Sequence, residues 1–257
     1  MPESVGYRHL HLSSPSLAYM SSQREVLDLL IRSAEAHVTD IGTANNLSNP
    51  ARIPAALPSI LPIFLQKLTR VDITLRLPLE FFTSLECLED AAALDPKLEA
   101  LVQGWLELSS SLCCLSNLRT LQFWLDHDTP DPWAVVNERV ALSPLSQLFK
   151  APHLNVSFSL PKLHPKLENV ERHLTQTDSL CFNVHRRVRQ RYFRDDSEEG
   201  VDKIVRKPDF PFLLDAVEFV DMEMAEIEKT ERDTWEMGID VEEMMREMSA
   251  IPGSIVI

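Results

Sequence analysis

The sequence predicts an α/β fold, in which an irregular stack of strand and helix repeats forms a small, mostly parallel sheet with helices on one face. Three observations predict it. An apolar pattern typical of strands occurs three times along the chain. Segments with helical spacing separate the copies, which implies parallel strands joined by right-handed crossovers. From Phe210 onward, acidic residues and apolar steps of three and four predict an additional acidic C-terminal helix.

In each copy the apolar spacing changes from three residues to two, as it does where a chain enters a strand that points alternate side chains into one core. The first copy consists of Leu65, Leu68, Val71, Ile73 and Leu75. The second lies fifty residues further on, at Leu115, Leu118, Leu121, Phe123 and Leu125. The third follows at an offset of thirty-three, at Leu148, Ala151, Leu154, Val156 and Phe158. A truncated copy opens the chain at Tyr7, Leu10 and Leu12. The expected strands are residues 70–77, 118–125 and 154–160.

Apolar residues in helical register predict helices over residues 21–38, 94–115 and 133–140. Between the first of these helices and the first strand, a cluster of Gly, Asn and Pro from Gly42 to Pro50 predicts a loop.

These elements divide the chain into a leucine-rich repeat domain (1–194), a charged linker (195–209) and an acidic amphipathic helical extension (210–257). The extension either folds back as a cap on the stack or projects and offers its methionine side chains to a partner. We expect the cap, because an exposed apolar stripe of this size lowers solubility.

Charge and composition exclude several classes of protein. Of the net charge of −14, the segment Asp195 to Ala250 carries −13, from 19 acidic and 6 basic residues, so the repeat domain is nearly neutral. No apolar run approaches the roughly 20 residues that cross a bilayer, and the first residues lack the apolar stretch expected of a signal peptide. The four cysteines have no C-x-x-C spacing. We expect a cytoplasmic or nuclear protein with no membrane partner, disulfide framework or zinc site.

The residues between the inward-facing ones of each strand are expected on the opposite face of the sheet. They are polar apart from Trp124, and an indole among polar neighbours is typical of an anchor in a protein interface. We therefore predict that this face binds another protein. The candidate interface residues are Asp72, Thr74, Arg76, Gln122, Trp124, Asp126, Asn155 and Ser157.

An alternative function is a metal-dependent or acid/base hydrolase that uses the loop residues Asp126, His127 and Asp128 together with Glu138. The sequence has no glycine-rich phosphate loop and no H-E-x-x-H or G-x-S-x-G motif. We therefore expect a protein that is not an enzyme and that uses no catalytic residue, metal, cofactor or small-molecule ligand.

A weaker alternative is nucleic-acid contact through a basic patch, because arginine guanidinium groups bind phosphates. The competing interpretation is a solvated helix face that pairs with the acidic residues that follow. The overall pI of about 5.0 argues against nucleic acid as the partner. The patch consists of Arg186, Arg187, Arg189, Arg191 and Arg194.

The L-x-x-L-x-x-L-x-L-x-L pattern of Leu115 to Leu125 resembles leucine-rich-repeat-like domains. The segments LRTLQFWLDHD, WAVVNERVALSPL, LPKLHP and HRRVRQRYF resemble a group of fungal F-box-like proteins. The resemblance implies a subunit whose repeats hold a substrate while an N-terminal F-box docks to a ubiquitin-ligase adaptor. No F-box is evident in this sequence. The implied role is therefore the substrate-receptor-like part of a ubiquitin-ligase subunit.

Overall fold

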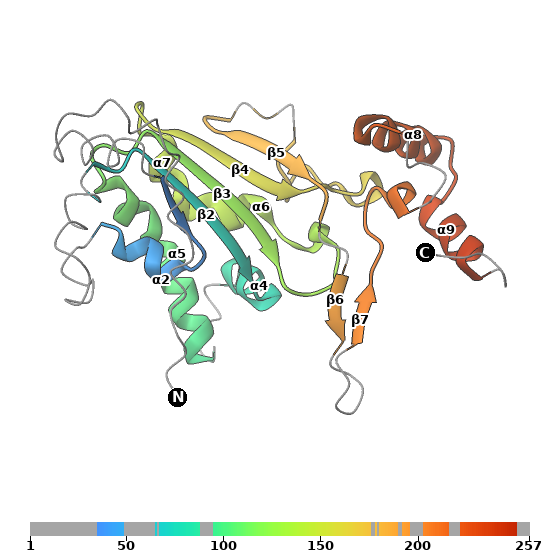
Figure 1. The fold of residues 1–257 in the computed structure, drawn as a ribbon, viewed down its shortest axis with the longest axis horizontal. Helices are drawn as coiled ribbons and strands as arrows, with labels where there is room; N and C mark the ends of the chain where they lie inside the picture. Colours follow the sequence, from blue (N-terminus) through green and yellow to red (C-terminus); the bar gives the residue numbers. More distant parts are fainter. Residues whose placement is uncertain are drawn as a thin grey trace, which may run out of the picture.

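The computed structural model describes residues 35–48, 65, 67–87, 95–175, 178, 180–189, 192–195, 203–215 and 222–250. Its centre is a five-stranded sheet in the order β1-β2-β3-β4-β5, in which every pairing is parallel (Figure 1). The strands are β1 (Glu35–Val38), β2 (Arg70–Leu77), β3 (Thr120–His127), β4 (Asn155–Pro161) and β5 (Asn183–Arg187). The predicted α/β fold with a parallel sheet is confirmed.

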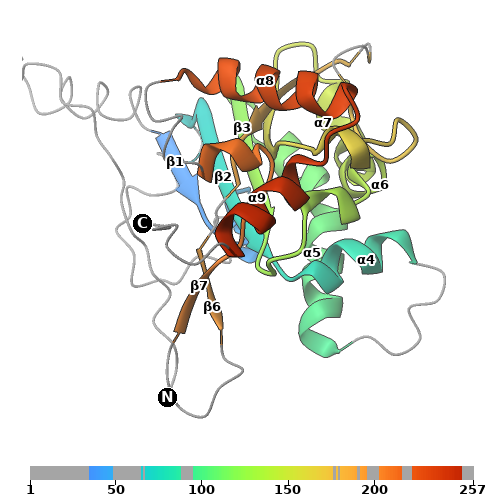
Figure 2. The same cartoon turned by 90° about the vertical axis from the view of Figure 1, so that its right-hand side faces the viewer.

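Helices pack on one face of this sheet, as Figure 2 shows for α4 to α7. They are α2 (Ile41–Asn46), α4 (Leu79–Glu86), α5 (Pro96–Cys113), α6 (Glu138–Leu142) and α7 (Ser146–Phe149), with the short 3-10 turns η4 (Trp133–Val135) and η5 (Ser143–Leu145) among them. The longest, α5, begins with Asp95, whose side chain accepts a hydrogen bond from the Lys97 amide, and has Pro96 in its first turn.

The core lies between the sheet and these helices, and alternate residues of each strand fill it. Trp105 on α5 packs edge-on against Phe123 of β3, and its indole N–H donates to the Ala141 carbonyl at 2.8 Å. The inward residues of the three central strands are all buried: Val71, Ile73, Leu75, Leu121, Phe123, Leu125, Val156, Phe158 and Leu160. Burying a side chain of this size contributes roughly 1.5–3 kcal/mol.

The apolar repeats coincide with the register of the sheet. Ile73 pairs with Phe123, so the offset of fifty between the first two copies is the register itself. Phe123 in turn pairs with Phe158, an offset of thirty-five, so the third copy is displaced by two residues from the predicted alignment. A displacement of two leaves every side chain on the face that the sequence predicts.

The same turn leads into each of these three strands. The amide of Leu68 donates to the Leu65 carbonyl at 3.3 Å, and the amide of Leu118 donates to the Leu115 carbonyl at 3.0 Å. Leu154 makes the equivalent bond to Ala151 at 3.1 Å. The threefold spacing that precedes each strand is therefore a turn, and the twofold spacing is the strand itself.

Two predictions for the N-terminal third are wrong. The helix predicted over residues 21–38 does not include its last turn, because residues 35–38 form β1, where Ala36 and Val38 point into the core. The loop predicted from Gly42 to Pro50 contains α2 instead, since the Asp40 side chain accepts a hydrogen bond from the Thr43 amide at 2.7 Å and starts a helix. The rest of that predicted helix and the opening copy at residues 7–12 lie outside the described residues.

The linker and extension also differ from their predicted form. Part of the linker is a strand, β7 (Lys203–Arg206), which pairs with β6 (Tyr192–Asp195) in an antiparallel hairpin. The extension comprises the turn η7 (Phe212–Asp215) and two helices, α8 (Met224–Glu236) and α9 (Val241–Ala250), in place of one continuous helix. Gly238, with φ of 85°, follows α8 and reverses the chain.

The C-terminal unit contacts the segment that follows β4, at the turn η6 (Pro165–Leu167), and lies beyond the carboxyl ends of β4 and β5 (Figure 1). Its small apolar cluster consists of Phe212, Leu213, Ile227 and Val241, with Met222, Met244 and Met245 packed against it. Ion pairs join it to the repeat domain: Lys162 with Glu228, Arg232 with Glu168, and Lys166 with Asp240. No helix among the described residues is both long and apolar enough to cross a membrane.

Candidate binding face of the sheet

The face of the sheet opposite the helices is polar, and we call it the polar face. Apart from Asp126 and Arg187 at one end, it consists of the outward residues of the five strands: Glu35, His37, Arg70, Asp72, Thr74, Arg76, Thr120, Gln122, Trp124, Asn155, Ser157, Ser159, Asn183 and His185. All of these side chains are exposed or half-buried, whereas the residues between them on β2, β3 and β4 are buried.

The register brings the predicted interface residues together in rows. Asp72 pairs with Gln122, and Gln122 with Ser157. In the next row Thr74 pairs with Trp124. Seven of the eight candidate residues therefore share one continuous surface across β2, β3 and β4, because parallel strands in register place alternate side chains side by side.

The Trp124 ring is partly covered by another side chain of the sheet. The guanidinium carbon of Arg187, on β5, lies 3.5 Å from the centre of the Trp124 ring and covers part of it. Burial lowers the pKa of Arg187, and the neighbouring Asp126 carboxylate opposes this shift. The tryptophan is therefore held in place by a cation–π contact, which fixes its orientation on the polar face.

Asp126 is the eighth candidate residue, and it is not available to a partner. It points to the polar side of β3 but is only 2% exposed. Arg189 Nε donates to its Oδ1 at 2.8 Å, and Arg187 donates to its Oδ2 at 3.2 Å. The chain that leaves β5 thus covers this end of the sheet, which the sequence pattern of β3 alone does not predict.

The β6–β7 hairpin borders the polar face at the same end. Phe193 of β6 is buried, and the guanidinium carbons of Arg76 and Arg189 lie 5.7 and 5.5 Å from the centre of its ring. Arg76 also donates to the Asp128 carbonyl at 3.4 Å. Arg76 is therefore exposed but anchored at the rim of the face.

The described arginines of the predicted basic patch do not form an exposed surface. The run is a strand, not a helix, so Arg186 and Arg187 point to opposite faces of the sheet. Arg186 points inward to Glu138, with Nη2 donating to Oε2 at 2.8 Å, while Arg187 and Arg189 hold Asp126. Arg191 and the side chain of Arg194 lie outside the described residues.

The acidic loop of the hydrolase alternative does not assemble into a site either. His127 points inward and stacks on Trp133, with ring centres 5.7 Å apart. Burial, assisted by the charge of Arg189, lowers the pKa of His127 to about 4. Glu138 is buried behind Trp133, whose indole N–H donates to its Oε1 at 2.7 Å, and Asp128 is exposed. Three of the four side chains are therefore buried in structural networks.

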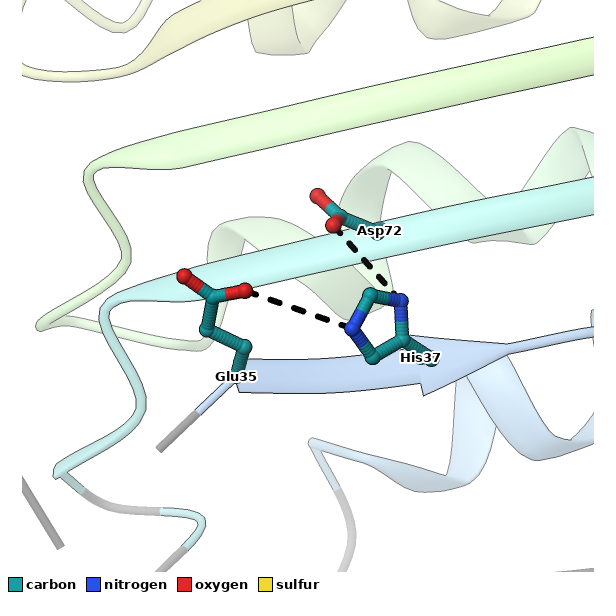
Figure 3. A group of neighbouring side chains, drawn as sticks. All are labelled: Glu35, His37 and Asp72. Carbon is teal, nitrogen blue, oxygen red and sulfur yellow. Dashed lines mark ion pairs between the residues drawn. The ribbon is translucent and has the colours of Figure 1, made fainter. Parts of the chain in front are cut away.

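A group of three side chains that sequence analysis missed lies at the other edge of the polar face (Figure 3). His37 of β1 stands between Glu35 and Asp72, with Nε2 4.0 Å from Glu35 Oε2 and Nδ1 3.6 Å from Asp72 Oδ2. Arg70 contacts both carboxylates, and its hydrogen bond with Asp72 raises its pKa. The predicted helix over residues 21–38 hid this group, because residues two apart face in different directions on a helix but share a face on a strand.

No family model matches the chain, and no curated protein or solved structure shows significant similarity to it. A functional proposal therefore depends on the fold and on the geometry of these surfaces.

Proposed function

We propose that the chain is a non-enzymatic protein-interaction module and that its partner binds the polar face. The observation that supports this is the sidedness of the sheet: the helices described above pack on one face, while the other is polar. A parallel sheet usually has helices on both faces. Strand and helix stacks of the solenoid type are the exception, since they leave one face of the sheet for a binding partner.

The chemistry of the face suits a protein surface. Rows of amide, hydroxyl and carboxylate groups offer donors and acceptors, and the part of the Trp124 ring that Arg187 leaves uncovered adds a rigid contact near the middle. The resemblance to fungal F-box-like proteins supports a substrate-receptor-like role in a ubiquitin ligase, with the substrate on this face, and a cytoplasmic or nuclear location. Neither the hydrolase nor the nucleic-acid alternative is retained, because most of the described residues that each requires are buried in ion pairs or stacked rings.

The test is site-specific photocrosslinking in an extract of the source cells. A photoreactive amino acid at Thr74 or Ser157, both on the polar face, is expected to capture the same protein. The matched control is Gln103, which is exposed on α5 on the helical side.

Once that partner is purified, Thr74→Arg is expected to weaken its binding by about tenfold or more, roughly 1.4 kcal/mol, because a bulky charge then stands in the middle of the contact. Gln103→Arg is expected to leave the affinity unchanged. Equal capture from Gln103, or unchanged binding by a correctly folded Thr74→Arg variant, would contradict the proposal.

A further inference from the structure

Glu35, His37 and Asp72 are placed by the backbone of two adjacent strands. Glu35 and His37 are two residues apart on β1 and share its outward side, while Asp72 on β2 is the register partner of His37. The parallel sheet fixes the separation of the strands at roughly 4.8 Å, so the three side chains stay together without support from a loop.

The three side chains lie near one another, at distances somewhat longer than those between the ligands of a bound metal ion. One ligand atom from each residue can be chosen so that all three lie within 4.8 Å of one another. Ligand atoms around a tetrahedral zinc ion at about 2.0–2.2 Å are about 3.3–3.6 Å apart. The His37 ring stands between the two carboxylates and turns a different nitrogen to each, so binding of a single ion requires the ring to rotate. The Glu35 and His37 side chains, 41% and 42% exposed, have room for such rotations.

The donor set selects the kind of ion. One imidazole nitrogen and two carboxylate oxygens suit Zn²⁺ or a similar first-row divalent ion, whereas Ca²⁺ and Mg²⁺ prefer oxygen ligands alone. Three protein ligands leave at least one coordination position open to water or to a group from a partner. We propose that Glu35, His37 and Asp72 form a binding site for a divalent ion of the Zn²⁺ type at the β1 edge of the polar face.

Arg70 competes with such an ion for the carboxylates of Glu35 and Asp72. Its Nε and Nη2 donate to Asp72 at 3.1 and 3.2 Å, and Nε lies 3.7 Å from Glu35 Oε2. A metal ion has to displace the guanidinium group from the two carboxylates, and Arg70, 40% exposed, can turn toward solvent. A metal site and a simple ion-pair cluster respond in opposite ways to the removal of Arg70. The removal weakens an ion-pair cluster, but it strengthens metal binding.

The test is a calorimetric titration of the full chain with Zn²⁺ at neutral pH. His37→Gln is expected to lower the affinity of one site by about tenfold or more, because metal affinity depends on each ligand. His185→Gln is the matched control, since His185 is an exposed histidine on the same face but on the opposite edge strand, β5. Arg70→Gln is expected to raise the affinity severalfold.

The visible absorption of bound Co²⁺ gives a second readout, and its intensity is expected to disappear in His37→Gln but not in His185→Gln. Thermal unfolding without metal shows whether each variant is folded. The proposal is wrong if the wild-type chain binds no Zn²⁺, if folded His37→Gln binds it equally well, or if Arg70→Gln lowers the affinity.

Discussion

The buried carboxylate of Glu138 is matched by the charge of Arg186. Glu138 is 1% exposed and accepts hydrogen bonds from the Trp133 indole at 2.7 Å and from the Leu174 amide at 2.8 Å, in addition to its ion pair with Arg186. Arg186 also donates to the Leu174 carbonyl at 2.6 Å. This network joins α6, the η4 turn and β5, so it holds the edge strand in place.

Glu138→Gln is expected to lower the free energy of unfolding by about 3–5 kcal/mol, because it leaves the half-buried guanidinium of Arg186 with carbonyl partners but no opposite charge. Urea unfolding measures the change. The control is Glu86→Gln, which removes the more exposed pair of Glu86 with Arg172 and is expected to cost less than about 1 kcal/mol. Similar losses in the two variants would show that the Glu138 network contributes no more than a surface pair.

Among the elements, the packing of α2 against α5 depends on one glycine. Gly104 lies within α5, where a Cβ atom would come 2.9 Å from Ile41 Cγ2 of α2. Its carbonyl accepts a hydrogen bond from Asn45 Nδ2 at 2.8 Å. The close approach of the two helices therefore requires a residue without a side chain at this position, although glycine is a poor helix former.

Gly104→Ala is expected to lower the free energy of unfolding by about 1–2 kcal/mol, because the stiff β-branched Ile41 cannot move away easily. Gly42→Ala, in α2, is the matched control. A Cβ atom there meets only Asp40 Oδ1, at 3.4 Å, so the better helix propensity of alanine is expected to leave stability unchanged or raise it by up to about 1 kcal/mol. Thermal unfolding compares the two variants, and the same sign of change in both would contradict the packing argument.

For the whole molecule, two buried histidines link stability to pH. His127 lies in the core of the sheet, and His164 lies between the repeat domain and the C-terminal unit, 4.4 Å from the centre of the Trp235 ring. Burial lowers the pKa of each to about 4, and the charges of Arg189 and Lys166, respectively, act in the same direction. The folded protein therefore keeps both imidazoles neutral.

Stability is expected to fall as the pH drops from 7.5 to 5.5. An unfolded histidine has a pKa near 6.5, so in this range the unfolded state binds more protons than the folded state. The stabilisation is present above pH about 6.5 and is lost progressively toward pH 4, on the order of 2 kcal/mol for each histidine. Urea unfolding at several pH values measures the slope. His164→Gln, which cannot titrate, is expected to reduce it, and an unchanged slope would exclude His164 as its source.

The apolar repeats predicted the middle of the sheet well, because a strand's alternation is local and appears directly in the spacing of its residues. The expected strand 70–77 has the observed bounds of β2, and the expected polar face carries Thr74, Gln122 and Ser157 as predicted. The two edge strands were missed. β1 is four residues long, and β5 places the charged Arg186 on its inward side, so neither has a clear apolar alternation.

The sequence by itself determined the fold class, the parallel pairing and which side chains of the central strands face the core, since these follow from periodicity along a few residues. Only the tertiary structure decided which residues meet at each end of the polar face. Asp126 is buried because Arg187 and Arg189, about sixty residues later, reach its carboxylate, and Glu35, His37 and Asp72 meet because two strands distant in sequence are neighbours in the sheet. The physical reason is that charges pair between residues that are close in space. The spacing of residues along one strand does not indicate which distant segment of the chain lies next to that strand.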